Sequence, residues 1–283
     1  MEVLKKRSSG VLLEWVWPPL LGNPSRELPL TKPTHPDLCG GLISFERTLI
    51  PVTNWSSGHR DPSDFSTYLS SPCFEDYAKL AFTLTAQAID LFATFQASEG
   101  AFGTTSTTSS NNTYAQAWQK LFTAIESWFA QRPPEMQPLH SIPSTQTSYN
   151  TTTTPSPSSP FPTVLYSSAA GFSGNQFAHT AAILMLQRKP RHLTTTNTTT
   201  PTPNPTAKPR SILHHARQIC GIALSNDHHG GWMNSIQPIW IAGKLMSHPS
   251  EHEALLKWLR KVEDVTGWAT GWRRRELEGW WGV

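Results

Sequence analysis

The carboxyl-terminal segment from Gly267 to Gly282 places four tryptophans around a run of three arginines. The wider C-terminal region is equally rich in this residue, because seven of the 12 tryptophans lie from Trp232 onward. Tryptophan is costly to leave in water and dominates the packing energy of cores and interfaces. A chain that ends in this way is therefore predicted to pack its C-terminus against the rest of the fold.

Three tracts of low sequence complexity divide the chain. They run over about 103–113, 141–162 and 189–209 and consist mostly of Thr, Ser, Pro and Asn. Such segments carry too little apolar surface to offset the entropy that is lost on ordering. We expect all three to be disordered surface loops. The apolar segments between them are too short to form separate cores, so residues 75–283 are predicted to be one domain.

Apolar side chains outside the tracts recur every three or four residues, which is the spacing of one face of an α-helix. Helices with this pattern are expected at Tyr77–Gln96, Tyr114–Gln131, about Ser173–Gln187 and Ser211–Leu224. No convincing alternation of apolar and polar residues, as in a strand, appears beyond residue 60. The sequence therefore predicts an all-α fold.

Three further helices are expected toward the C-terminus. A short apolar helix follows Pro238. The next begins at Ser250, which would form a capping box with Glu253, and Gly267 ends it. Thr270 is the expected N-cap of the last helix.

The first 74 residues are harder to interpret because prolines recur throughout them. Proline fixes φ and removes a hydrogen-bond donor, so long regular elements are not expected here. Seven of them lie at positions 18, 19, 24, 29, 33, 36 and 51. Residues 38–52 are compatible with either a short strand or a short helix. Residues 1–74 are therefore interpreted as a proline-rich leader of uncertain structure.

Bulk composition argues against several classes of protein. The net charge of +3 gives no general reason to expect nucleic-acid binding. Cys39, Cys73 and Cys220 are far apart, odd in number and without zinc-ligand spacing, so neither a disulfide scaffold nor a zinc site is expected. No targeting signal is evident, and no stretch approaches the roughly 18 apolar residues that a membrane helix needs. We expect an intracellular protein without a membrane segment.

No motif for catalysis or metal binding is evident. His214-His215 and His228-His229 are adjacent pairs, and neighbours on a helix point about 100° apart, so each pair offers at most one easy metal ligand. We expect a structural or surface role for these histidines. No GxSxG turn and no cysteine in a catalytic context is present, and Cys220 lies on an apolar helical stripe. The expectation is therefore no enzymatic activity, no catalytic or metal-binding residues and no cofactor.

Two features of the C-terminal segment have competing interpretations. The run Arg273–Arg275 could bind nucleic acid, but it spreads around a helix and Glu276 and Glu278 offset its charge. A solvated face, with one arginine paired to a buried carboxylate of the neighbouring helix, is favoured. Second, the rings of four tryptophans are predicted to form one buried cluster that anchors the C-terminal helices, or else a surface for a partner or effector. These tryptophans are Trp240, Trp258, Trp268 and Trp272.

An ordered series of short motifs over about residues 75–282 resembles one protein family. The motifs are Trp118-x-x-Leu121 with Trp128, Arg132–Leu139, Phe161–Pro162, Asn175–Ala181, His215–Ile219, Ser225–Asp227 with Trp232, Gln237–Gly243, Val262–Trp268 and the closing segment Gly267–Gly282. The series resembles the fungal-specific transcription factor domain of the zinc binuclear cluster family, and its ARCA-like group in particular.

The resemblance implies a helical regulatory domain with no catalytic residues to transfer. The motif residues that are also expected in the core are Trp118, Trp128, Pro133, His179, Asn226, Trp232, Pro238, Trp240, Gly243, Glu263, Gly267, Trp268, Thr270, Trp272, Leu277 and Trp281. In the family this domain follows a six-cysteine, two-zinc DNA-binding cluster. No such cluster occurs in this sequence. We therefore expect either a truncated gene product or a paralogue that has lost its DNA reader.

The resemblance also implies control of RNA polymerase II transcription in the nucleus. The expected partners are other transcription-regulatory proteins or a second copy of the chain, without sequence-specific DNA binding by this chain alone. Two alternatives stay open at this point. One is a helical small-molecule-binding or enzymatic domain with a tryptophan-lined pocket. The other is a degenerate, partly unfolded fragment.

Overall fold

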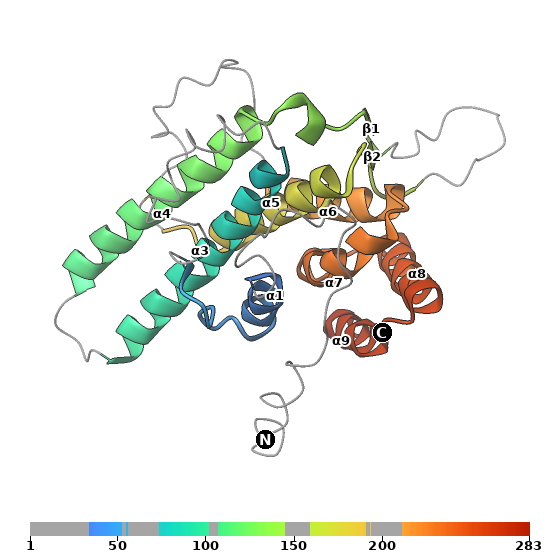
Figure 1. The fold of residues 1–283 in the computed structure, drawn as a ribbon. Helices are drawn as coiled ribbons and strands as arrows, with labels where there is room; N and C mark the ends of the chain where they lie inside the picture. The colour runs from blue at the N-terminus through green and yellow to red at the C-terminus, as the bar shows by residue number, and fades with distance from the viewer. Residues whose placement is uncertain are drawn as a thin grey trace, which may run out of the picture.

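The computed structural model describes residues 34–52, 55, 74–101, 107–144, 159–190, 193 and 211–283. Within these residues, eight α-helices make up the fold and the strands form one short hairpin (Figure 1). The prediction of an all-α fold is therefore confirmed. No helix in the described part of the chain is both long and apolar enough to cross a membrane.

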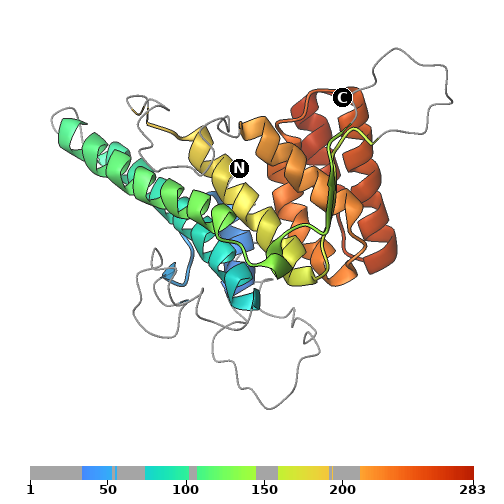
Figure 2. The same ribbon diagram turned by 90° about the horizontal axis from the view of Figure 1, so that it is seen from above.

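Two long helices form one side of the molecule. α3 (Phe74–Ala101) and α4 (Thr107–Ala130) lie side by side, as Figures 1 and 2 both show. Tyr77 and Trp128 join them: the Tyr77 hydroxyl donates to the Trp128 carbonyl at 2.9 Å, and the Trp128 indole donates to the Tyr77 carbonyl at 3.0 Å. Both side chains are buried. The two bonds therefore satisfy the polar groups that burial would otherwise penalise.

α5 (Ala169–Gln187) is the central helix, and every residue from Gly171 to Met185 is buried. It packs against α3, α4, α6 (Ile212–Ser225) and α7 (His229–Gly243), so it has no side that faces solvent. Ser168 begins α5 by accepting a hydrogen bond from the Gly171 amide at 3.0 Å. The helix therefore begins four residues earlier than the predicted start at Ser173.

Polar side chains inside α5 find partners on the surrounding elements. Asn175 donates to the Met136 carbonyl at 2.8 Å, in the short 3-10 helix η2 (Pro134–Met136). Gln176 donates to the Ile219 carbonyl at 3.2 Å and accepts from the Ser235 hydroxyl at 2.6 Å. A buried polar group costs little when it is hydrogen-bonded, so these contacts fix how α5 sits among its neighbours.

The hairpin that the sequence did not predict is held by side chains at the end of α6. β1 (His140–Ile142) and β2 (Thr163–Leu165) are antiparallel. Next to β2, the Asn226 side chain donates to the Val164 carbonyl at 2.7 Å and accepts from the Tyr166 amide at 2.9 Å. Three residues per strand are too few to leave an alternation in the sequence. Side-chain bonds from the end of α6 (Ile212–Ser225) supply the order instead.

The predicted loops differ from the structure where the structure describes them. α4 already begins at Thr107, so most of the expected loop 103–113 is helical. The expected loop 141–162 is wrong at both ends: it begins inside β1, and Phe161 and Pro162 are buried. Pro162 lies so close to Gly221 of α6 that a Cβ there would overlap its carbonyl oxygen. Residues 145–158 and most of 189–209 lie outside the described residues.

α1 (Thr34–Ser44) is a helix although a proline lies inside it. Pro36 falls in the first turn, where an amide has no helical partner and its absence costs little. Leu38 and Leu42 are fully buried, and α1 packs against α3 and α7. The Asp37 carboxylate then accepts from the amides of residues 49 and 50, both at 2.8 Å. Residues 1–33 lie outside the described part.

The C-terminal helices are α7 (His229–Gly243), α8 (Pro249–Thr266) and α9 (Gly271–Trp281). The expectation of a short helix after Pro238 is wrong, because α7 begins at His229 and contains Pro238. The sequence at the start of α7 has no stripe of apolar residues from which the helix could be predicted. Gly231 is needed there, since a Cβ would overlap the Phe172 ring of α5.

The caps of α8 and α9 also differ from expectation. His248, rather than Ser250, caps α8, and it pairs with Glu251 instead of Glu253, while Pro249 occupies the first helical position. Gly267 ends α8 with φ of 71°, as predicted. Thr270 is the N-cap residue of α9, as predicted, but its side chain forms no capping hydrogen bond, because its hydroxyl donates to the Leu259 carbonyl at 2.8 Å.

Candidate functional site

Aromatic and basic side chains alternate where the end of α1, the end of α7 and α9 meet (Figure 1). We refer to this group as the tryptophan junction. Its members are Phe45, Trp240, Lys244, Trp272, Arg273 and Trp280. The junction combines exposed aromatic rings with two cationic side chains.

Arg273 is the centre of the junction and is only 1% exposed. Its guanidinium carbon lies 4.0 Å from the ring centroid of Trp240 and 3.8 Å from that of Trp272. One terminal nitrogen donates to Glu276 at 2.5 Å, and the other donates to the Gln237 side-chain oxygen. Burial lowers the pKa of Arg273, and the Glu276 carboxylate opposes that shift. The guanidinium thus joins α7 to α9 as a structural group.

Lys244 is the second cation of the junction, and three aromatic rings lie near its ammonium group. Its ammonium lies 3.5 Å from the Trp240 centroid, 5.5 Å from that of Trp280 and 5.6 Å from that of Phe45. Burial, followed by the charge of Arg273, lowers the pKa of Lys244. Ammonium groups at this distance from ring faces are attracted to them electrostatically.

Two adjacent indoles close the C-terminal end of α7. The N–H of Trp280 donates to the Lys244 carbonyl and that of Trp281 donates to the Gly243 carbonyl, both at 3.0 Å. The last carbonyls of a helix have no hydrogen-bond donor within the helix, and the two indoles supply donors to carbonyls at the end of α7. His252 of α8 stacks on Trp281, with ring centroids 3.9 Å apart.

Three tryptophans of the C-terminal segment keep much of their surface in contact with solvent. Trp268 is 43% exposed, Trp272 37% and Trp280 65%. We call these three the exposed tryptophans. Aromatic side chains are enriched at the interaction sites of soluble proteins.

The prediction that four tryptophans form one buried cluster is wrong. Trp258 packs against Trp232 of α7, with centroids 6.4 Å apart, and Trp268 is exposed. The Arg273 guanidinium lies against the ring of Trp240 and also against the ring of Trp272. A stripe of apolar residues cannot reveal such an arrangement, because it depends on a cation that sequence reasoning assigns to solvent.

Lys244 and Phe45 were missed for a similar reason. The only sequence signal for Lys244 is its position four residues after Trp240, which brings the two side chains to one helix face. Phe45 lies in a segment whose prolines concealed the helix before it. It has a positive φ of 55°, which turns the chain at the end of α1.

The other motif residues differ widely in exposure. Those that are buried are Trp118, Trp128, His179, Asn226, Trp232, Pro238, Gly243, Thr270 and Leu277. Those that are half-buried are Pro133, Trp240, Glu263 and Trp281, and Gly267, Trp268 and Trp272 are exposed. Several of them connect chain segments by hydrogen bonds: Trp118 donates to the Met185 carbonyl at 2.8 Å and Trp232 to the Asn226 carbonyl at 2.8 Å. These hydrogen bonds give the buried members of the set a structural role.

The two members of the pair His214-His215 differ in exposure. His215 of α6 is buried, and its Nδ1 lies 2.8 Å from Nδ1 of His179 in α5, whereas His214 is exposed. The Phe129 ring lies against this contact, 4.7 Å from the His179 ring. Across the described ranges, no group of three or more His, Cys, Asp or Glu side chains could hold a metal ion.

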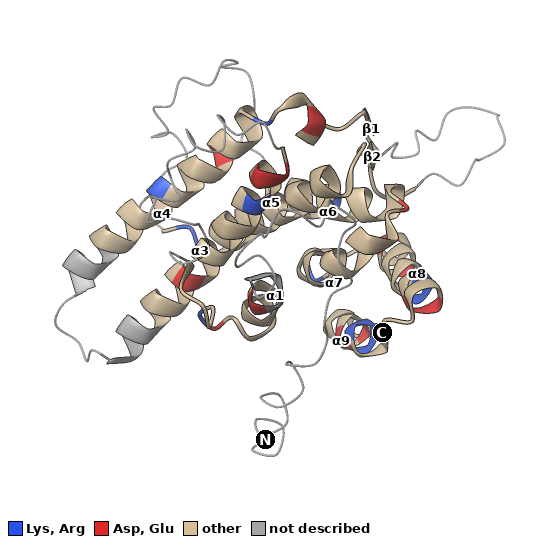
Figure 3. Cartoon of the chain, viewed as in Figure 1, with Lys and Arg blue, Asp and Glu red and all other residues tan. Residues whose placement is uncertain are grey.

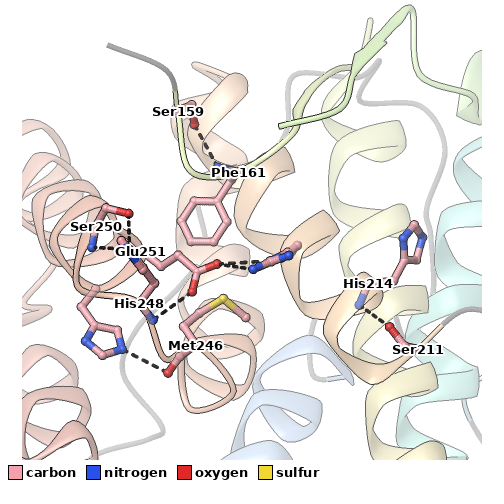
Figure 4. A network of polar contacts seen from close by, with 10 residues as sticks. Ser159, Phe161, Ser211, His214, Met246, His248, Ser250 and Glu251 are labelled. Carbon is pink, nitrogen blue, oxygen red and sulfur yellow. Dashed lines mark hydrogen bonds and ion pairs between the residues drawn. The ribbon is translucent and has the colours of Figure 1, made fainter. Parts of the chain in front are cut away.

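Charged side chains of both signs alternate along α8 and α9 (Figure 3). Arg274 pairs with Glu263 of α8 at 2.8 Å, so one arginine of the run does meet a carboxylate of the neighbouring helix, but that carboxylate is half-buried and not buried as expected. Glu251 lies at the start of α8, where Figure 4 shows its carboxylate reaching the main chain of His248. The same carboxylate pairs with Arg217 of α6 at 3.0 Å.

The comparisons with known proteins give one partial likeness. A segment of 67 residues is 37% identical to the "Transcription activator AMTR1" of Alternaria alternata. The segment is 24% of this chain and 9% of that activator's length. No protein-family model matches the chain, and no solved structure matches it. The matched segment is thus similar to a small part of a fungal transcription activator.

Proposed function

We propose that this chain is a regulatory domain of the fungal-specific transcription factor type, related to the zinc binuclear cluster family. In this proposal it works in the nucleus in the control of RNA polymerase II transcription. The observation that carries the proposal is the 37% identity to a fungal transcription activator. The helical fold supports it, since the resemblance of the motifs implies a helical regulatory domain.

The proposed mode of action is contact with other transcription-regulatory proteins or with a second copy of the chain. The exposed tryptophans support this mode. Aromatic residues are enriched in the centres of protein interfaces, where they contribute most of the binding energy. Arg273 and Lys244 hold Trp272, Trp240 and Trp280 in fixed positions, so the rings would lose little conformational freedom on binding.

The proposal includes neither catalysis nor sequence-specific DNA binding by this chain alone. Burial raises the pKa of the Cys39 thiol to about 12 and raises that of Cys220 further, so neither thiol is a ready nucleophile. Arg273 and Arg274 are engaged with Glu276 and Glu263. Two of the three arginines in the run are therefore already paired.

A tethering assay tests the proposal. The chain is fused to an unrelated DNA-binding domain in fungal cells that carry a reporter gene with the matching binding sites. We expect reporter expression to differ from that given by the DNA-binding domain alone. The fusion carrying Trp128→Ala, whose core is disrupted, serves as the control and should lose the effect. An intact fusion that accumulates in the nucleus and leaves the reporter unchanged would overturn the proposal.

A further inference from the structure

An extended arm of the chain, residues 159–166, lies along α6 and contains β2. The Val164 carbonyl in the arm accepts from the side chain of Asn226, which follows the last residue of α6. Pro162 lies against Gly221, further back in the same helix. From residue 166 back to residue 159, the arm therefore passes from the end of α6 toward its start.

Ser159 begins the arm and is exposed. Its hydroxyl accepts a hydrogen bond from the Phe161 amide at 3.3 Å, and the Phe161 side chain is only 1% exposed. Pro160 between them has a fixed φ and no amide N–H, the features by which proline-directed kinases select the serine or threonine before it. Within the described ranges, Ser159 is the one serine or threonine that precedes a proline. The buried Phe161 thus holds a kinase acceptor at the surface.

Arg217 is the cation of α6 that the start of the arm approaches. It lies four residues before Gly221, so the two residues are on the same side of the helix, about 6 Å apart along its axis. The extended chain from Pro162 back to Ser159 spans at most about 10 Å. A phosphate on Ser159 is therefore within reach of the long Arg217 side chain.

The position of Phe161 supports this approach. In Figure 4 its ring points from the arm toward the Glu251 carboxylate, which pairs with Arg217 at 3.0 Å. Arg217 donates to Glu251 through Nε and Nη2. Its side chain is 34% exposed, and its Nη1 group takes no part in these two bonds. One edge of the guanidinium thus holds Glu251, and the remaining donors suit a second anion.

We propose that Ser159 is a phosphorylation site and that Arg217 binds the phosphate. In this step the Ser159 hydroxyl oxygen attacks the γ-phosphorus of ATP on a proline-directed kinase. The new O–P bond forms, the bond from that phosphorus to the bridging oxygen of ADP breaks, ADP leaves and the hydroxyl proton passes to a base of the kinase. Guanidinium groups suit the product because their planar donors match phosphate oxygens.

The modification changes the contact between α6 and the start of α8. A phosphate adds a charge of about −1.5 to −2 there. Glu251 is 3% exposed and already pairs with Arg217, so the guanidinium bridges two anions after phosphorylation. Charge-assisted hydrogen bonds from Arg217 then hold the start of the arm to α6. The regulatory meaning of this contact rests on the function proposed above, whereas the modification itself does not.

The first test asks whether the folded chain accepts phosphate at Ser159. The chain is incubated with ATP and a proline-directed kinase, with a synthetic peptide of residues 155–164 as the control for kinase activity, and mass spectrometry of peptide fragments locates the phosphate. We expect phosphorylation at Ser159 and none at Ser167, which is exposed but precedes a serine. Absence of phosphate at Ser159 in the folded chain, or equal modification of Ser167, would overturn the proposal.

The second test measures whether Arg217 binds the phosphate. Phosphoserine is incorporated at position 159 during translation, and phosphorus NMR follows its second ionisation with pH. We expect its pKa in the folded chain to be about one unit below that in the urea-unfolded chain, because a nearby cation favours the dianion. Arg217→Lys keeps a cation beside Glu251 but loses the planar fork, so it should reduce the shift. Arg260→Lys, at an exposed position of α8, is the matched control and should not.

Equal pKa values of the phosphoserine in the folded and unfolded chains would contradict binding by Arg217. So would an undiminished shift in Arg217→Lys. Failure of the reporter assay alone would leave both results standing.

Discussion

The tryptophans of the α3–α5 half, Trp118 and Trp128, are both buried, whereas the α7–α9 half combines buried tryptophans with exposed ones. In the α3–α5 half, Trp118 and Trp128 are almost completely buried, and their indoles donate to the Met185 and Tyr77 carbonyls. In the α7–α9 half, Trp280 makes the same kind of bond to the Lys244 carbonyl, yet 65% of it is exposed. The indole N–H is used in the same way in both places. What differs is the setting of the ring: Trp128 is enclosed by Tyr77 and Phe129, whereas the Trp280 ring lies at the surface, 5.5 Å from the Lys244 ammonium.

The largest expected effect is that of Trp128→Ala. Removing a fully buried aromatic ring costs about 3–5 kcal/mol of unfolding free energy, through lost packing and the cavity left behind. The variant also leaves the Tyr77 carbonyl without its indole donor. Chemical denaturation followed by circular dichroism measures the loss. Trp268→Ala in the α7–α9 half is the matched control and should lose less than about 0.5 kcal/mol. Equal losses in the two variants would break the comparison.

Arg273→Ala should have the next largest effect, about 2–3 kcal/mol. The substitution removes the bonds to Gln237 and Glu276 and leaves Trp240 and Trp272 without the cation between them. The loss stays below that of a fully buried ion pair, because 48% of the Glu276 side chain is exposed.

Arg275→Ala provides the control for Arg273, since Arg275 is an exposed neighbour on the same helix. Thermal unfolding should separate the two variants by several degrees. If both melted at the wild-type temperature, the description of Arg273 as the structural centre of the junction would be wrong.

A smaller effect is expected for Trp281→Phe. Phenylalanine keeps a ring against His252 but removes the N–H that donates to the Gly243 carbonyl. A net loss of about 1 kcal/mol follows, the usual contribution of one hydrogen bond. Trp272→Phe removes an N–H that donates to the Ala269 carbonyl at an exposed site, and it should cost less. The reverse order in urea denaturation would contradict the role of Trp281 as a cap of α7.

The smallest effect concerns pH. The hydrogen bond from Lys261 lowers the pKa of the Asp227 carboxyl in the folded chain. A carboxyl with a lowered folded pKa stabilises the fold above its unfolded pKa, and that contribution is lost as the pH falls through the folded value. Stability should therefore decline below about pH 4, slightly less steeply in Lys261→Met. The difference is small because both groups are exposed. A steeper decline in Lys261→Met would contradict the assigned sign.

The sequence predicts helices well where an apolar stripe makes them. α3, α4 and α6 lie where periodicity places them, and Gly267 ends α8 as its backbone freedom suggests. Prediction failed where partners distant in the chain supply the order. β2 depends on Asn226, and the start of α7 depends on Phe172 packing over Gly231.

The candidate site, too, was predicted only where local sequence decides it. That the C-terminal tryptophans matter follows from composition alone, but which of them are exposed does not. Trp258 and Trp268 have the same side chain, and only the path of the turn between α8 and α9 decides that one is buried and the other is 43% exposed. Arg273 was expected on a solvated face, and its burial follows from Gln237, 36 residues away in sequence.

The central claim is that the exposed tryptophans form a contact surface, whereas the tryptophans of the α3–α5 half form a core. The most direct test is the tethered reporter with Trp268→Ala and Trp272→Ala combined, alongside Leu139→Ala, a 71% exposed control beside the hairpin. The account predicts that the double variant accumulates and melts within a few degrees of the unaltered chain but loses the effect on the reporter, while Leu139→Ala keeps it. A stable double variant with a full reporter effect would contradict the account.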